Sequence, residues 1–190
     1  MKTSRPLILI DPGHGGLDPG ATAKGCTEAS INLRVAQQLG PMLFSERFDI
    51  HYTRYFDQSV SLATRVQISD AIRPDLFLSL HCNSASSPGA KGLEVFTSPG
   101  QTKSDGAATC LIDSLKFSFP DSIFRADDSD GDPDKEANFY VLKETRAPAV
   151  LVEMGFISHA AERAWLLQES TPLMISLALT NGLLAWRTTL

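Results

Sequence analysis

The sequence is poor in cysteine and has no long apolar run. Only three of its 190 residues are cysteines, and their scattered positions fit neither a disulfide framework nor a zinc finger. No stretch of about 18 apolar residues occurs, so no membrane span is predicted. The N-terminal apolar run covers only residues 7–10, which is too short for a secretory signal. We therefore expect synthesis in the cytoplasm, without a signal peptide.

Positive charge is also in deficit. The chain has 17 lysines and arginines against 22 aspartates and glutamates, a formal net charge of −5 at pH 7. This balance argues against a nucleic-acid-binding protein, which usually carries a basic excess. A length of 190 residues fits one domain, and no linker or internal repeat divides it. We expect a single domain over residues 1–190.

Short apolar runs alternate with longer segments of helical periodicity. Strands are predicted at residues 7–10, 49–54, 76–80, 92–97, 139–142 and 149–154. Helices are predicted at residues 28–39, 61–72, 106–117, 159–168 and 172–186. This alternation is typical of an α/β fold, here a mainly parallel twisted sheet of about six strands with helices on both faces.

Three local signals refine this prediction. Thr27 is placed to cap the first helix at its N-terminus. The pair Gly40-Pro41 is expected to end or kink that helix, unless the apolar residues that follow continue it. The segment Arg125–Asn138 is rich in aspartate, glycine and proline, and it is predicted to be a polar loop at the rim of the substrate groove.

Three ionisable residues lie where α/β folds build their sites, just beyond the carboxyl ends of strands, and a fourth lies at the start of a helix nearby. His14 follows the first strand after a tight turn, His81 directly follows the third, and Glu153 closes the last. Glu28 opens the helix after the glycine-rich loop. Two imidazoles and a carboxylate suit a catalytic zinc with an open fourth position, and another carboxylate would serve as general base. The alternative is ordinary polar residues at strand ends, with Glu28 favoured by the helix dipole.

Other motifs are near misses. The segment GHGGLD ends in Asp18, where the dinucleotide fingerprint requires glycine or alanine, and GATAKGCT has Cys26 where a P-loop requires lysine. The acidic segment does not place its ligands in the EF-hand pattern. A solvated loop is the better interpretation of that segment.

Seven segments carry a resemblance to a known family. They are ILIDPGHGGLDPGA, TEASINL, TRYFDQSVSLATRVQISDA, LFLSLHCNSA, KGLEVF, KEANFYVLKET and APAVLVEMGFIS. In this order the sequence resembles the zinc-dependent N-acetylmuramoyl-L-alanine amidases of bacteria and their phages, the amidase-3 family. The similarity runs from Leu7 to about Trp186, and the set of motifs is far more specific than any one of them.

The resemblance implies one zinc ion per chain, bound by His14, Glu28 and His81, with Glu153 as the catalytic carboxylate. It implies cleavage of the amide between N-acetylmuramic acid and L-alanine of the peptidoglycan stem peptide. Asp11 or a backbone carbonyl is expected to orient His14, and a capping role is the alternative for Asp11. An inactive zinc-bearing module that only grips peptidoglycan is the alternative.

The same resemblance predicts the kind of protein to which this domain belongs and where it acts. The chain is expected to be the catalytic domain of a phage endolysin or a bacterial autolysin, without a separate wall-binding domain. It would act on the extracytoplasmic cell wall after release or export. We expect a monomer, with peptidoglycan as its only partner.

Overall fold

The computed structural model describes residues 5–129 and 131–190. Its strands are β1 Leu7–Pro12, β2 Thr22–Ala23, β3 Cys26–Thr27, β4 Asp49–Tyr52, β5 Leu76–Asn83, β6 Glu94–Thr97, β7 Lys135–Glu136 and β8 Ala149–Phe156. Its helices are α1 Glu28–Ser45, α2 Leu62–Ile72, α3 Asp105–Ser118, α4 Tyr140–Glu144, α5 Ala160–Leu166 and α6 Thr171–Arg187.

A mostly parallel sheet forms the centre of the molecule. Over the described residues it has six strands in the order β4-β1-β5-β8-β6-β7, beside a small β2-β3 hairpin. Every neighbouring pair in the large sheet is parallel except β6 with β8. The prediction of an α/β fold with a mainly parallel sheet is confirmed.

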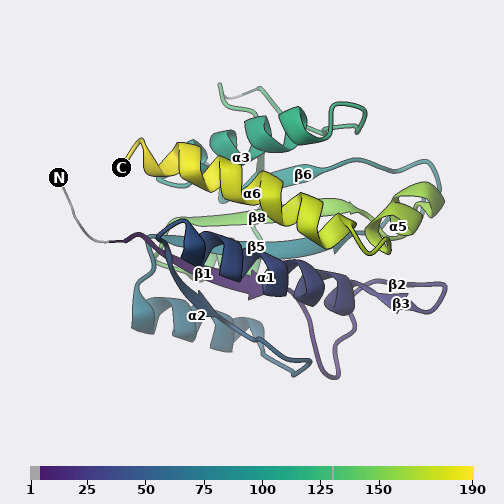
Figure 1. The fold of residues 1–190 in the computed structure, drawn as a ribbon, viewed down its shortest axis with the longest axis horizontal. Helices are drawn as coiled ribbons and strands as arrows, with labels where there is room; N and C mark the ends of the chain where they lie inside the picture. The colour runs from purple at the N-terminus through teal and green to yellow at the C-terminus, as the bar shows by residue number, and fades with distance from the viewer. Residues whose placement is uncertain (1–4, 130) are drawn as a thin grey trace.

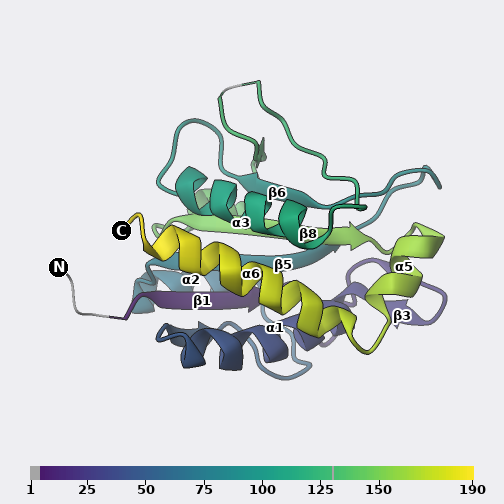
Figure 2. The same ribbon diagram turned by 45° about the horizontal axis from the view of Figure 1, so that its top comes forward.

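Helices cover both faces of this sheet, as predicted. Helices α1, α3 and α6 lie together on one face, and α2 lies on the other (Figures 1 and 2). Side chains of successive strand residues point to opposite faces. In β8, Val152 and Met154 join the core under α1, α3 and α6, whereas Leu151 packs with the smaller cluster next to α2 and α4. Glu153 therefore projects from the same face as Leu151.

The strand predicted at residues 139–142 is wrong, because this segment forms the short helix α4. Val141 and Leu142 are adjacent, yet both are buried in the same cluster with Phe96. A strand would direct such neighbours to opposite faces, whereas one helical turn can bury both. The sixth strand is β7, inside the segment predicted to be a loop.

Helix α1 does not end at Gly40-Pro41 but continues to Ser45. Leu43, beyond the proline, is fully buried and fixes the last turn in the core. Gly40 permits β4 to lie close, because a Cβ there would stand 1.6 Å from the Tyr52 hydroxyl oxygen. At the other end Thr27 caps the helix as predicted, accepting a hydrogen bond from the Ser30 amide at 3.3 Å.

No helix within residues 5–129 and 131–190 is both long and apolar enough to cross a membrane.

Candidate metal centre

The loop after β1 directs His14 back over the carboxyl end of the sheet. His14 has a left-handed backbone with φ of 61°, a conformation that L-residues rarely adopt and that concentrates at functional sites. Buried arginines fix this turn through its carbonyl oxygens. Arg54 donates to the Pro12 and Gly13 oxygens, each at 2.9 Å, and Arg65 donates to the His14 oxygen at 2.8 Å.

His14, Glu28 and His81 form a compact cluster that could hold a metal ion. One ligand atom from each lies within 4.8 Å of the other two. Glu28 Oε1 lies 3.2 Å from His14 Nε2 and 2.8 Å from His81 Nδ1. A tetrahedral zinc with bonds of about 2.0–2.2 Å needs ligand atoms about 3.3–3.6 Å apart. The separations at Glu28 are shorter than this by about 0.1–0.8 Å, so the three side chains must move slightly apart to take the ion. Two imidazole nitrogens and a carboxylate oxygen suit zinc as donors.

Two glycines make room for this cluster. A Cβ on Gly13 would stand 2.2 Å from His81 Cε1, within the imidazole ring. A Cβ on Gly20 would lie 2.7 Å from both Glu28 Oε2 and His14 Cδ2. The glycine-rich loop thus serves close approach to the ligand side chains as well as the tight turn.

The charges in the cluster are strongly coupled. The hydrogen bond to Glu28 raises the pKa of His14 to about 9, and the contact with Asp18 adds to that effect. Burial alone would raise the pKa of Glu28, but hydrogen bonds with His14 and His81 outweigh it and hold that pKa well below its ordinary value. A metal ion would replace the proton on His14, because only the free imidazole nitrogen can be a ligand.

Glu153 lies beside this cluster on the next strand. It is in register with His81 across β5 and β8, so the two side chains project from the same face of the sheet. Burial raises the pKa of Glu153 to about 8, and repulsion by Glu28 and Glu94 contributes. Its Oε2 atom is buried without a hydrogen-bond partner in the described part of the chain. A buried carboxylate atom with no partner is costly and marks a site with a task.

The residue that orients His14 is Asp18, which sequence reasoning missed. Asp18 Oδ2 accepts a hydrogen bond from His14 Nδ1 at 2.8 Å, which leaves Nε2 facing Glu28. The expectation for Asp11 is wrong, because its buried carboxylate pairs with Arg65 and accepts from the Ser79 hydroxyl at 2.8 Å. The available signal was a carboxylate four residues after the histidine in a tight loop.

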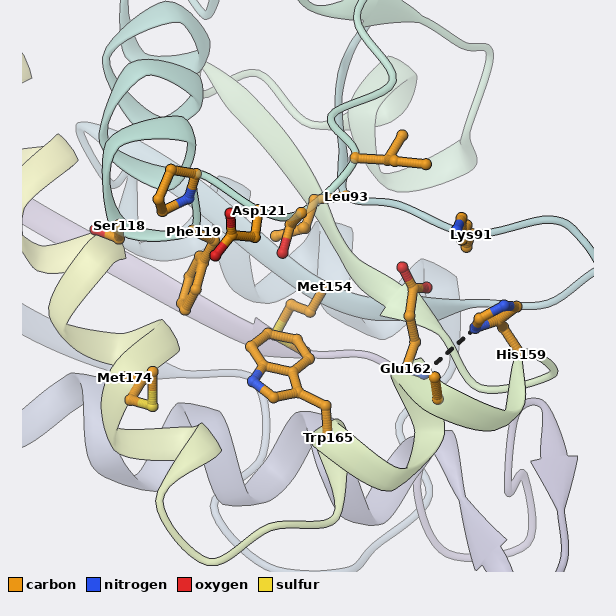
Figure 3. A pocket seen from close by; sticks show the side chains of 14 residues that line it. Lys91, Leu93, Ser118, Phe119, Asp121, Met154, His159, Glu162, Trp165 and Met174 are labelled. Atoms are coloured by element: carbon orange, nitrogen blue, oxygen red, sulfur yellow. Dashed lines mark hydrogen bonds between the residues drawn. The ribbon is translucent and has the colours of Figure 1, made fainter.

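Two pockets differ in their relation to the cluster. A cavity of about 340 Å³ lies beside it, lined by both histidines and by loop residues that include Ser59 and Ser61. A second cavity of about 440 Å³ is lined by Phe119, Trp165 and Met154 (Figure 3). Met154 follows Glu153 in β8 and points to the opposite face of the sheet. The second cavity is therefore separate from the metal cluster.

The fold and the cluster define the class of this protein. It is an α/β domain with two histidines and a carboxylate gathered at the carboxyl ends of its parallel strands, where they could hold a metal ion. Residues 8–185 match the N-acetylmuramoyl-L-alanine amidase family. The chain belongs to that family.

Individual relatives agree with this assignment. The amidase CwlM of Bacillus licheniformis is 35% identical over 178 residues, covering 93% of this chain and 66% of that protein. The endolysin of Bacillus phage SPP1 is 33% identical over 171 residues, covering 86% of this chain and 59% of that protein. The chain thus spans about two thirds or less of the length of these relatives.

A solved structure has the same fold. The catalytic domain of the amidase CwlV from Paenibacillus polymyxa superimposes with a TM-score of 0.87 at 26% sequence identity. The match covers 96% of this chain and 98% of that one. The described fold is therefore that of an amidase catalytic domain.

Proposed function

We propose that this domain is a zinc-dependent amidase of peptidoglycan, which hydrolyses the bond between the lactyl group of N-acetylmuramic acid and L-alanine. One arrangement carries the proposal: His14, Glu28 and His81 form a metal-sized cluster, and Glu153 stands in register with His81 beside it. Membership of the amidase family supports the same reaction.

In this proposal His14, Glu28 and His81 hold the zinc ion. Zinc bound there would lower the pKa of a coordinated water to about 7 and polarise the scissile carbonyl. Asp18 fixes the ring of His14 with Nε2 toward the site, as carboxylates commonly do for metal-binding histidines. The charge of Glu28 partly neutralises a divalent cation.

Glu153 is proposed to move the proton. It takes a proton from the attacking water and passes it to the nitrogen of the leaving amine, so the peptide departs as a free amine. Burial raises its pKa and so favours the protonated form that it reaches after taking the proton of the water, which suits delivery of that proton to the leaving amine. The cavity of about 340 Å³ beside His14 offers space for a muramoyl sugar.

We further propose that residues 1–190 act as one monomeric catalytic domain on the cell wall, in an endolysin or an autolysin. A relative named endolysin and a relative named amidase match 86% and 93% of this chain. Both kinds of protein would release the same products from the wall.

The test is digestion of isolated peptidoglycan by the zinc-loaded protein. We expect new L-alanine N-termini and glycan free of peptide, both measurable by mass spectrometry. If the protein binds peptidoglycan but releases neither product, it is a wall-binding module and not an enzyme.

Two variants test the assigned roles. His81→Ala should lose stoichiometric zinc by elemental analysis, whereas His51→Ala, exposed in β4, should keep it. Glu153→Gln should keep zinc but fall at least about a hundredfold in rate, since general acid–base catalysis contributes about 10²–10⁴-fold. Loss of zinc from Glu153→Gln would instead make Glu153 a ligand and reopen the role of Glu28.

A further inference from the structure

A buried carboxylate with two cations lies on the far side of Glu153 from the metal cluster. Glu94 in β6 is in register with Glu153 in β8, and its side chain is almost fully buried, at 2% exposure. Its Oε1 atom accepts from Arg125 Nε at 2.8 Å and from Lys135 Nζ at 2.7 Å. Its Oε2 atom accepts from the Asn83 side-chain amide.

Both cations of this group reach solvent. The side chains of Arg125 and Lys135 are 44% and 29% exposed, and Lys135 also attracts the Asp127 carboxylate. Arg125 uses only its Nε–H on Glu94, and its guanidinium carbon lies 5.5 Å from the centre of the Phe156 ring. Among residues 5–129 and 131–190 its two Nη atoms have no hydrogen-bond partner, so they can donate to a ligand. A guanidinium with free Nη donors favours a carboxylate, which it can bind with two parallel hydrogen bonds.

We propose that Arg125 and Lys135 form a carboxylate-binding subsite for the stem peptide, on the leaving-amine side of the scissile bond. This inference rests on the proposed amidase function. Glu94 acts as the positioning residue that holds both cations beside Glu153. The subsite makes a free carboxylate near the scissile amide a determinant of substrate choice.

The order of the strands indicates which side of the scissile amide bond lies next to the subsite. Strand β8 lies between β5, which carries His81, and β6, which carries Glu94. The carbonyl of the scissile amide faces the metal cluster, and its nitrogen must face Glu153 to receive the proton. The peptide that continues from this nitrogen therefore runs toward β6.

The reach is short. Neighbouring strands lie about 4.8 Å apart, and one extended residue spans about 3.3–3.6 Å. The subsite is thus matched to a carboxylate on the second residue of the stem, the one after L-alanine. The muramoyl sugar would occupy the opposite side, where the cavity beside His14 lies.

The experiment compares two peptide probes by calorimetry on the zinc-loaded protein of residues 1–190. The first is L-alanyl-D-glutamate with its γ-carboxyl blocked as methylamide, so that only the α-carboxylate is free. The second carries an amide at that α position. We expect the wild type to bind the carboxylate probe at least about tenfold more tightly, as is typical of charged hydrogen bonds.

The variants locate this preference. Arg125→Met should abolish it, Lys135→Met should reduce it, and Arg125→Lys should restore part of it. Lys91→Met removes an equal charge from the rim of the second cavity and should leave the preference intact. Equal binding of both probes by the wild type overturns the proposal, as does a preference that survives Arg125→Met.

Kinetics on the matching muramoyl dipeptides separate this inference from the proposed function. If the protein binds the carboxylate probe through Arg125 but releases no sugar, the subsite stands and the amidase function fails. If it hydrolyses both dipeptides with equal KM, the amidase function stands and the subsite fails. A fall in kcat alone for Arg125→Met would show that Arg125 acts through Glu153, which also contradicts the subsite.

Discussion

Two loops flank the candidate site, and they are attached to the domain in different ways. The His14 loop, residues 13–21, is held by buried Arg54 and Arg65, which donate to its backbone oxygens. The acidic loop, residues 125–138, is attached to β6 by contacts of partly exposed cations with Glu94, by the pairing of β7 with β6 and by the hydrogen bond from Thr97 to Asp134. Buried cations therefore hold the first loop, whereas the cations of the second loop reach solvent.

The largest expected effect comes from removing the buried cation of the first loop. Arg65→Met leaves the Asp11 carboxylate buried without its charged partner, since both side chains are at most 3% exposed. Breaking a buried ion pair from one side costs about 3–5 kcal/mol. We expect this loss in the free energy of unfolding, measured by urea denaturation of the metal-free protein.

Arg125→Met is the matched change in the second loop. Its pair with Glu94 is 44% exposed on the arginine side, and Lys135 remains on the same carboxylate. Exposed pairs contribute about 0–1 kcal/mol. If both variants lost the same stability, the proposed difference between the loops would be wrong.

The extent of sequence-based prediction follows this contrast. Five of the six predicted strands are present, because apolar periodicity is a local signal. The carboxyl ends of those strands pointed to three of the four candidate residues, and the family resemblance supplied their expected roles. Asp18 was missed because the sequence does not show how the turn after His14 folds, and so does not show which nearby carboxylate contacts the imidazole. Arg54 and Arg65 were missed because their partners are backbone oxygens of a loop more than 40 positions away in sequence.

Helix α4 and Glu94 show the same limit. Val141 and Leu142 form an apolar pair that periodicity alone cannot assign to strand or helix. Glu94 sits within an apolar run, and its significance depends on the register between β6 and β8, which only the assembled sheet supplies. Candidate residues at strand ends could be predicted from the sequence, whereas the groups that position them across the sheet could not.

The next effect in size concerns close approach in the first loop. Gly13→Ala would place a Cβ 2.2 Å from His81 Cε1, and the imidazole must turn away. Displacing a ligand in this way should weaken zinc affinity about 10–100-fold, as changes around metal ligands commonly do. Competition with a chromophoric chelator measures this change.

Gly131→Ala is the control in the acidic loop. A Cβ there meets nothing within 4 Å, although its φ of +110° strains any residue other than glycine. We expect a stability cost of about 1 kcal/mol with unchanged zinc affinity. Unchanged zinc affinity in Gly13→Ala would show that the loop yields and that the approach to His81 is not tight.

The smallest expected effect is the pH dependence of stability that Asp134 contributes in the acidic loop. Burial raises the pKa of Asp134 from 3.8 to about 7, against the Thr97 hydrogen bond that lowers it, and Asp132 adds to the rise. Between these pH values the folded chain keeps a proton that the unfolded chain has released. The free energy of unfolding must therefore fall as the pH rises from about 4 to about 7. Asp134→Asn removes this dependence while its amide oxygen can still accept from Thr97.

We expect the melting temperature of Asp134→Asn to gain on that of the wild type between pH 5 and pH 8. A gain of about 2–4 °C corresponds to about 1 kcal/mol in a domain of this size. Asp127→Asn is the control, because a hydrogen bond with Ser129 lowers the pKa of that exposed carboxyl, so it stays ionised throughout this range. A melting difference for Asp134→Asn that is constant between pH 5 and pH 8 would mean that Asp134 is ionised in the folded chain. The hydrogen bond from Thr97 would then stabilise an ionised carboxylate beside β6.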